Sequence, residues 1–313
     1  TIIRPEGTSP MTIRFDDRVA IVTGAGAGLG RSHAMLLASR GAKVVVNDPG
    51  GAVDGRGGQH AVADKVVAEI KAAGGQAVAN HDSVADAKSA QNIVDAAVNT
   101  WGRCDILVNN AGILRDKAFN NMSMEDFEFT VQVHFMGTVY CTRAAWPIMR
   151  KQQYGRVVVT TSGSGTVGNF GQSNYGAAKM AVNGLINVLR FEGAKYNILC
   201  NAISPSANTR MTETLLPPHM IKYMRPEFVS PAVAWLCSEE CDANGEIIAA
   251  TAGNYARVQY FQSEGVQFDP DEPVTIEMLA EKIATIRDLS KAKPYTGLMG
   301  TVEASLRAMG KIT

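Results

Sequence analysis

The chain has 313 residues, of which 46% are hydrophobic, and its 30 Lys and Arg residues balance 30 Asp and Glu residues. This balance argues against a general nucleic-acid or anionic-membrane binder, because such proteins need an excess of basic residues. No apolar run approaches the ~18 residues of a membrane span, and the first residues lack the apolar core of a signal peptide.

Short runs rich in Val and Ile alternate with helix-length segments from residue 18 to about residue 250. Nearly continuous apolar runs are typical of strands buried on both faces of a parallel sheet. The predicted strands are 18–23, 42–47, 75–80, 104–109, 155–161, 197–203 and 246–251. The alternation predicts a doubly wound, Rossmann-like α/β fold of about seven strands with right-handed crossovers.

One of the helical segments carries a capping signal, because Ser123 and Asp126 have the spacing of a variant capping box at the start of a helix predicted over 123–151. The pattern changes after Thr251, where a stretch without clear period precedes amphipathic helices predicted over 275–289 and 301–312. We therefore predict a domain over 15–255 and a C-terminal helical extension, 256–313, packed on it.

The five cysteines and five histidines are scattered along the chain, without a Cys-x-x-Cys pair or the spacing of metal ligands. We expect reduced structural thiols and no metal site.

The first predicted strand runs into "TGAGAGLGR", which places Gly24, Gly28 and Gly30 between a strand and a helix. Small residues there let the backbone approach a pyrophosphate, and the helix N-terminus offers free N–H groups and a positive dipole end. The alternative is a tight turn that needs glycine for its dihedral angles. The expected phosphate-binding residues are Gly24, Gly28, Leu29 and Gly30.

Asp48 stands at the tip of the second strand, eighteen residues after Gly30, near the spacing of an acid that binds an adenosine ribose. A carboxylate there repels a ribose 2′-phosphate and favours NAD over NADP, although the nearby Arg31 weakens that preference. Ligands of open α/β sheets bind at the carboxyl ends of the strands. Further expected cofactor contacts at those ends are Asp82, Ser83, Asn110, Ala111 and Gly112.

Tyr175 and Lys179 lie one helical turn apart in "TTSGSGTVGNFGQSNYGAAK". With the glycine loop and the parallel sheet, this segment resembles the short-chain dehydrogenase/reductase family over about residues 15–255. The family pattern implies a Ser thirteen residues before the Tyr, which is Ser162, with Ser164 as the alternative.

The resemblance implies that Tyr175 is the acid/base, that Ser162 holds the substrate oxygen, and that Lys179 tunes the Tyr and contacts the nicotinamide ribose. A free Tyr has a pKa of ~10 and is a poor base at neutral pH. We expect the charge of Lys179 and the oxidised nicotinamide to lower this pKa by about three units, which corresponds to about 4 kcal/mol.

The chain departs from the family pattern at two places. His134 stands where many members carry an Asn that completes a proton relay; a relay through the imidazole and a buried His held by a backbone carbonyl both remain open. Pro205 is followed by Ser206 where Pro-Gly is usual, and we expect Pro205 and Thr209 to contact the cofactor ahead of a mobile substrate lid.

Several further segments resemble one branch of the family, the (3R)-hydroxyacyl-CoA dehydrogenase part of peroxisomal multifunctional enzymes type 2 (D-bifunctional protein, 17-beta-hydroxysteroid dehydrogenase type 4). They are "VVVNDPGG", "NNAGILRDKAF", "VHFMGT", "QYGRVVVT", "GNFGQSNYGAAKMA", "RMTE", "WLCSEECDANG" and "DLSKAK". The resemblance implies NAD-dependent oxidation of (3R)-hydroxyacyl-CoA to 3-ketoacyl-CoA in fatty-acid β-oxidation, by a homodimer.

Support for CoA from the residues themselves is limited to cations near the expected site and an apolar segment, "TETLLPPHMIKYM", that fits an acyl channel or a plain lid helix. The candidate cations for CoA phosphates are Arg115, Lys117, Arg210, Lys222 and Arg225. Alternatives are a hydroxysteroid dehydrogenase, a 3-ketoacyl-carrier-protein reductase and a nucleotide-binding protein without turnover. The terminal "GKIT" is not of the Ser-Lys-Leu type, so we expect a cytoplasmic protein, or a peroxisomal one if the sequence is part of a multifunctional enzyme.

Overall fold

The computed structural model describes residues 12–58, 61–209 and 218–295, together with 302, 306, 307, 309 and 310. The chain divides into two compact units, Thr1–Arg257 and Val258–Thr313. This division falls two residues after the boundary predicted from the sequence. The packing of the second unit on the first stays a prediction.

The first unit is built on one sheet of eight strands in the order β3-β2-β1-β4-β5-β6-β7-β8. Its strands are β1 (Val19–Thr23), β2 (Lys43–Asn47), β3 (Gln76–Asn80), β4 (Ile106–Asn109), β5 (Gly155–Thr160), β6 (Ile198–Ser206), β7 (Ile247–Thr251) and β8 (Asn254–Val258). All neighbours from β3 to β7 pair in parallel. The doubly wound sheet and its seven predicted strands are therefore confirmed.

The eighth strand, β8, was not predicted. It follows β7 through Ala252 and Gly253, whose φ angles of 50° and 82° are those of a two-residue hairpin turn. Its sequence, "NYARV", is short and exposed over its first four residues, so it lacks the apolar signal of a buried strand.

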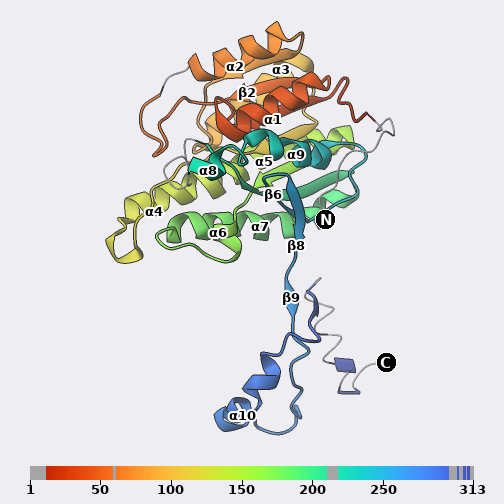
Figure 1. Cartoon of the computed structure of the whole chain (residues 1–313). Coiled ribbons are helices and arrows are strands. Elements are labelled where there is room, and N and C mark those ends of the chain that lie inside the picture. The colour runs from red at the N-terminus through yellow and green to blue at the C-terminus, as the bar shows by residue number, and fades with distance from the viewer. Residues whose placement is uncertain are drawn as a thin grey trace. The chain divides into compact units, whose positions relative to one another are not determined.

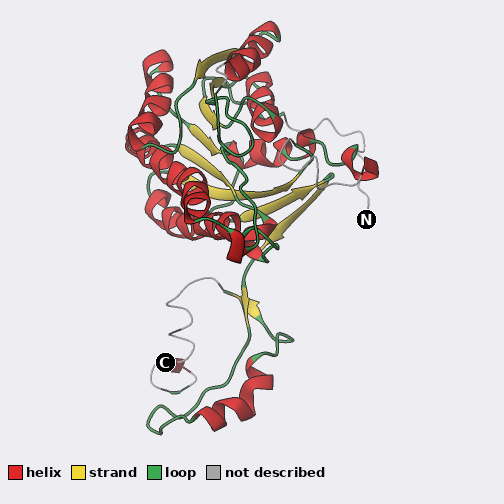
Figure 2. Cartoon of the chain, turned by 90° about the vertical axis from the view of Figure 1, so that its left-hand side faces the viewer, coloured by secondary structure: helices red, strands yellow, loops and turns green. Residues whose placement is uncertain are grey.

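Helices cover both faces of the sheet (Figures 1 and 2). They are α1 (Gly28–Ser39), α2 (Ala61–Ala72), α3 (Ala87–Trp101), η1 (Phe119–Asn121), α4 (Met124–Val131), η2 (Gln132–Met136), α5 (Gly137–Gln152), α6 (Gly163–Thr166), α7 (Ser173–Ala194), α8 (Pro218–Ile221), η3 (Pro226–Phe228) and α9 (Ser230–Cys237). Helix α1 packs on α2 and α9, whereas α3 packs on α5 and α4 packs on α7. All residues of the central strands β1, β4 and β5 are buried between these layers.

The helix predicted over 123–151 begins as expected, because the Ser123 hydroxyl accepts a hydrogen bond from the backbone N–H of Asp126 at 3.2 Å. It is not one regular α-helix. A π-helical turn, η2, separates α4 from α5 and contains His134. Such turns widen a helix locally and occur frequently at functional sites.

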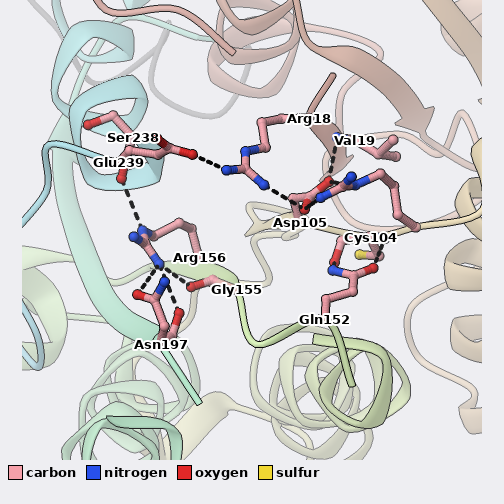
Figure 3. Close-up of polar contacts among 11 residues, drawn as sticks. Arg18, Val19, Cys104, Asp105, Gln152, Gly155, Arg156, Asn197, Ser238 and Glu239 are labelled. Carbon is pink, nitrogen blue, oxygen red and sulfur yellow. Dashed lines mark hydrogen bonds and ion pairs between the residues drawn. The ribbon is translucent and has the colours of Figure 1, made fainter. Parts of the chain in front are cut away.

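A polar network fastens the amino ends of the strands, at the edge opposite the carboxyl ends (Figure 3). The fully buried carboxylate of Asp105 accepts hydrogen bonds from the backbone N–H of Val19 at 2.9 Å and from two nitrogens of Arg103 at 2.7 Å. The buried Arg156 donates to the carbonyl oxygens of Ser238 at 3.0 Å and Asn197 at 3.0 Å. The backbone N–H of Arg156 donates to the carbonyl oxygen of Asp105 at 2.8 Å, so these bonds together join the starts of β1, β4 and β5 and the end of α9.

The second unit contains β9 (Phe261–Gln262), paired antiparallel with β10 (Lys293–Pro294), and α10 (Ile276–Ile286). The Thr275 hydroxyl caps α10, so this helix begins where it was predicted and ends three residues early. Most of the helix predicted over 301–312 lies outside the described residues. Within the described part of the chain, no helix is long and apolar enough to cross a membrane.

Candidate active site

A cleft of about 690 Å³ opens at the carboxyl ends of the central strands, where the loops that directly follow β1 to β6 meet. It is lined by all but one of the residues that the sequence nominated for catalysis or for binding the cofactor. Those lining it are Gly24, Gly28, Leu29, Gly30, Asp48, Ser83, Asn110, Ala111, Gly112, His134, Ser162, Tyr175, Lys179, Pro205 and Thr209. Asp82 does not line it: its carboxylate accepts hydrogen bonds from the side-chain amides of Asn80 at 2.8 Å and Asn92 at 3.2 Å, which shape the loop after β3.

The glycine loop forms the tight turn that the sequence left as one alternative, and binding of a phosphate there stays a proposal. Gly24 and Gly28 have φ angles of 63° and 52°, which glycine adopts without strain. A Cβ atom on Gly24 would lie 2.8 Å from the Cα of Ala111, so the turn also needs a residue without a side chain. Helix α1 starts at Gly28 behind Ala27, which has no side-chain oxygen to cap it. The first N–H groups of α1 therefore remain available to an anion in the cleft.

Asp48 is held at the end of β2 by backbone donors. Its two carboxylate oxygens accept hydrogen bonds from the N–H of Gly26 at 2.9 Å and of Gly50 at 2.7 Å. Arg31, which the sequence offered as a partner for a 2′-phosphate, donates its Nε to Glu69 on α2 at 2.8 Å. The free N–H groups at the start of α1 and the carboxylate of Asp48 have the chemistry that a pyrophosphate and a ribose of a dinucleotide require.

The catalytic candidates come together at the start of α7. The ammonium nitrogen of Lys179 lies 5.5 Å from the centre of the Tyr175 ring and donates to the carbonyl oxygen of Thr160 at 2.6 Å. Ser162 follows β5, and its hydroxyl lies close enough to that of Tyr175 for hydrogen bonding to lower the pKa of Tyr175. The hydroxyl of Ser164 donates instead to Gln172 Oε1 at 2.7 Å, so the geometry supports Ser162.

Small residues allow this approach of α6 to α7. A Cβ atom on Gly165 would lie 2.9 Å from the carbonyl carbon of Lys179, and one on Gly176 would lie 2.8 Å from the carbonyl oxygen of Ser164. The run of Gly and Ala around Tyr175 thus has a packing reason: it brings the loop after β5 against the helix that carries Tyr175 and Lys179.

The surroundings of Tyr175 and Lys179 shift the pKa values of both side chains. Burial raises the pKa of Tyr175 above its usual value, the hydrogen bond with Ser162 lowers it in part, and the negative charge of Asp116 raises it further. Burial also lowers the pKa of Lys179 to about 7. The charge of Lys179 is not among the causes that shift the pKa of Tyr175, so the lowering expected from Lys179 together with the oxidised nicotinamide stays a prediction.

His134 is buried beside these groups, with its ring edge-on to Tyr175 at 5.0 Å between centroids. Its Nε2 lies 2.7 Å from the carbonyl oxygen and 3.0 Å from the amide nitrogen of Ile113. Burial, and then the charge of Lys179, lower the pKa of His134 well below its usual value, so the ring is neutral. Its Nδ1 has no hydrogen-bond partner among the described residues.

The contacts of His134 with Ile113 satisfy either neutral tautomer: Nε2–H donates to the carbonyl oxygen, and an unprotonated Nε2 accepts from the amide. The backbone-held His foreseen as one alternative is therefore present. A proton relay through it stays a proposal.

Several cleft residues were missed from the sequence. On one side Gln172 Oε1 accepts from Asn169 Nδ2 at 3.0 Å and Gln172 Nε2 donates to Asp116 at 2.7 Å, while burial raises the pKa of Asp116. Apolar wall residues are Ile113, Leu114, Phe129, Val133 and Met224. Glycines after Asp48 signalled a loop there, but no periodicity shows that loop 49–58 turns back to line the cleft.

Four of the five cations proposed for CoA phosphates are described, and these four (Arg115, Lys117, Lys222 and Arg225) do not line the cleft. Arg115 is engaged within the fold, and Lys117 pairs with Asp126 at 3.2 Å. Lys222 and Arg225 lie over the rings of Tyr223 and Phe228. Arg210 and residues 211–217 of the expected lid lie outside the described residues.

Comparison with known proteins agrees with this geometry. The family described as short chain dehydrogenase matches residues 18–218 of the chain. The chain belongs to the short-chain dehydrogenase family. It is an oxidoreductase of the class that acts on hydroxyl groups.

Two relatives and two solved structures are similar to this short-chain dehydrogenase over most of its length. A short-chain type dehydrogenase/reductase of Mycobacterium tuberculosis is 53% identical over 277 residues, covering 88% of this chain and 96% of its own. Peroxisomal multifunctional enzyme type 2 of Drosophila melanogaster is 48% identical over 283 residues, covering 90% of this chain and 47% of its own. The chain thus spans about half the length of the fly enzyme.

The structure of the full-length fly enzyme superposes with a TM-score of 0.80 at 41% identity, covering 95% of this chain and 50% of that one. A 7α-hydroxysteroid dehydrogenase in complex with NADH and 7-oxo glycochenodeoxycholic acid superposes with a TM-score of 0.70 at 30% identity, covering 77% and 96% of the two chains.

Proposed function

We propose that the protein oxidises (3R)-hydroxyacyl-CoA to 3-ketoacyl-CoA with NAD, as a step of fatty-acid β-oxidation. The observation that carries the proposal is the single cleft that holds Ser162, Tyr175 and Lys179 beside the glycine loop and Asp48. The similarity to peroxisomal multifunctional enzymes supports the choice of substrate.

In this mechanism Tyr175 removes the proton of the substrate hydroxyl, and Ser162 donates a hydrogen bond that holds the same oxygen. NAD, when bound, supplies the acceptor for the hydride of the carbinol carbon and adds positive charge near the phenol. That charge favours the phenolate and opposes the effect of burial, which raises the pKa of Tyr175.

Lys179 contributes in its ammonium form. It is anchored by the Thr160 carbonyl and has two further N–H groups, which can hold a ribose hydroxyl and a water molecule. With a pKa of about 7, Lys179 can itself pass a proton near neutral pH. Among the described residues the buried Nδ1 of His134 has no hydrogen-bond partner, and the charge of Lys179 acts on this ring, which makes His134 the candidate relay residue.

Asp48 favours NAD over NADP, because its carboxylate accepts from ribose hydroxyl groups and repels a 2′-phosphate. Gly26 and Gly50 fix the carboxylate in place, and Glu69 engages Arg31, the cation that would have accommodated the phosphate. The NADH in the related hydroxysteroid dehydrogenase is consistent with this choice.

A hydroxysteroid dehydrogenase is the second candidate. The similarity to the 7α-hydroxysteroid enzyme favours it, and the apolar wall of the cleft suits a sterol as well as an acyl chain. We expect a homodimer in the cytoplasm, or in a peroxisome if the chain is part of a multifunctional enzyme.

The replacement Tyr175→Phe tests the proposal, because it removes the acid/base and leaves the cofactor cleft intact. We expect NADH formation from (3R)-hydroxyacyl-CoA to fall by roughly 100-fold or more, with NADH still bound, as measured by nicotinamide fluorescence. Retention of wild-type turnover by this variant would exclude the mechanism.

A further inference from the structure

Loop 49–58, which follows β2, is one wall of the cofactor cleft. Six of its residues line the cleft: Pro49, Gly51, Ala52, Val53, Gly55 and Gly57. The loop has a fixed shape of its own, because Ala52 N–H donates to the Arg56 carbonyl at 2.8 Å and Gly55 N–H donates to the Ala52 carbonyl at 2.9 Å.

The far end of this loop is tied to the segment that follows β4. The N–H of Leu114 donates to the Val53 carbonyl at 2.9 Å, and Arg115 Nε donates to the Asp54 carbonyl at 2.9 Å. Strand β1 lies between β2 and β4 in the sheet. The loop therefore spans the carboxyl end of β1, where the glycine loop begins, and the cleft lies between the two loops.

The side chain of Arg115 is largely buried and has several partners. Its side chain is only 10% exposed, its Nη1 pairs with Asp126 at 3.1 Å, and its guanidinium lies 4.4 Å from the centre of the Phe129 ring. Phe129 also lines the cleft. A planar guanidinium with several donors can hold a carbonyl, a carboxylate and a ring at once, which an ammonium group cannot.

Gly55 shows how closely the loop fits this anchor. It has a φ of 83°, and a Cβ atom there would lie 2.9 Å from Phe129 Cε1 and 3.1 Å from Ile113 Cγ2. The loop thus rests directly on the side chains around Arg115, and any added group at Gly55 must displace it.

We propose that Arg115 is a positioning residue that latches loop 49–58 across the cofactor cleft, so that the dinucleotide enters and leaves when the latch opens. The part concerning the dinucleotide rests on the proposed function. The latch assigns to Arg115 a role different from binding CoA phosphates, and it makes release of the reduced cofactor depend on a residue that does not touch the reacting atoms.

The variant Arg115→Met tests the latch, because it keeps the apolar stem and removes the donors. The matched control is Arg150→Met: Arg150 also lies 4.4 Å over a ring, that of Tyr196, and donates to its hydroxyl, but it is far from the loop in sequence and does not line the cleft. Gly55→Ala displaces the loop by a different route and serves if Arg115→Met fails to fold.

The first readout needs no cofactor. Arg56 is 75% exposed in loop 49–58, so trypsin cleavage after Arg56, identified by mass spectrometry, reports opening of the loop. We expect cleavage about tenfold faster in Arg115→Met and in Gly55→Ala, and unchanged in Arg150→Met, as the loss of a charge-assisted hydrogen bond implies.

The second readout is the rate of NADH dissociation in stopped-flow fluorescence, which we expect to rise about tenfold in the same two variants and not in the control. Equal cleavage and equal dissociation in all four proteins would overturn the latch, and so would acceleration of cleavage in Arg150→Met as well. If the wild-type protein bound no NADH, the proposed cofactor would fail, while the cleavage comparison would still decide whether the latch exists.

Discussion

Ser162 and Ser164 are the two candidates for the catalytic hydroxyl group, and their surroundings differ. The hydroxyl of Ser162 lowers the pKa of Tyr175, whereas the hydroxyl of Ser164 donates to Gln172 Oε1. We expect Ser162→Ala to lower kcat by roughly 100-fold, because it removes a donor to the reacting oxygen, and Ser164→Ala to lower it less than about tenfold. Steady-state NADH formation by the two variants checks this, and the reverse order would show that the other Ser is the catalytic one.

Lys179 links the catalytic site to the stability of the fold. Burial lowers its pKa to about 7 in the folded chain, whereas the unfolded value is near ~10.4. Between these two values the unfolded chain binds more protons, so the contribution of Lys179 makes the free energy of unfolding rise with pH. Below pH 7 Lys179 is protonated in both states, and burying its charge lowers the free energy of unfolding by the full amount.

We therefore expect the free energy of unfolding of the wild type, relative to Lys179→Met, to rise by about 2 kcal/mol from pH 7 to pH 9. Denaturant titrations of both proteins at each pH measure this difference. Parallel pH profiles for the two proteins would show that Lys179 keeps an ordinary pKa.

Asp105 joins the starts of strands β1 and β4 at the edge of the sheet opposite the cleft (Figure 3), so we expect its replacement to destabilise the fold. Its carboxylate is fully buried and accepts from Arg103, so Asp105→Asn leaves buried donors facing an amide nitrogen. We expect a loss of about 3 kcal/mol in the free energy of unfolding by denaturant. Asp16→Asn is the control, since the pair of Asp16 with Arg14 is exposed and should change little. Equal effects of the two changes would contradict the structural role of the network.

The elements with strong local signals were those that the sequence predicted. Buried strands are read from their apolar runs, and Ser123 identified a helix start because capping depends on residues three positions apart. The exposed β8 has no such apolar run, and the π-helical turn around His134 depends on packing rather than on local preference. Loop 49–58 was missed as a wall of the cleft because its anchor, Arg115, lies about sixty residues away in the sequence.

Within the site, too, the sequence predicted what depends on local spacing and not what depends on burial. The identities of Tyr175, Lys179 and Ser162 follow from their spacing, but the direction of the Tyr175 pKa depends on burial, which no short motif records. The role of Arg115 could not be predicted either, because its partners Asp54 and Asp126 lie far from each other in the sequence.

At the scale of the whole molecule, all cleft residues belong to the unit Thr1–Arg257. We propose that this unit performs the chemistry alone. The packing of the second unit on it and the homodimer remain proposals, and sedimentation of the purified protein measures the oligomeric state.

The proposed reaction, oxidation of a (3R)-hydroxyacyl-CoA with NAD, can be measured with the purified protein. NADH formation by the purified protein is followed with (3R)- and (3S)-hydroxyacyl-CoA of several chain lengths, with NAD and NADP in parallel and a hydroxysteroid as competitor. We expect turnover of the (3R) series with NAD and at least tenfold less with NADP, because Asp48 repels the 2′-phosphate. No turnover of any acyl-CoA, while NADH still binds, would contradict the proposed reaction and leave the hydroxysteroid activity as the next candidate.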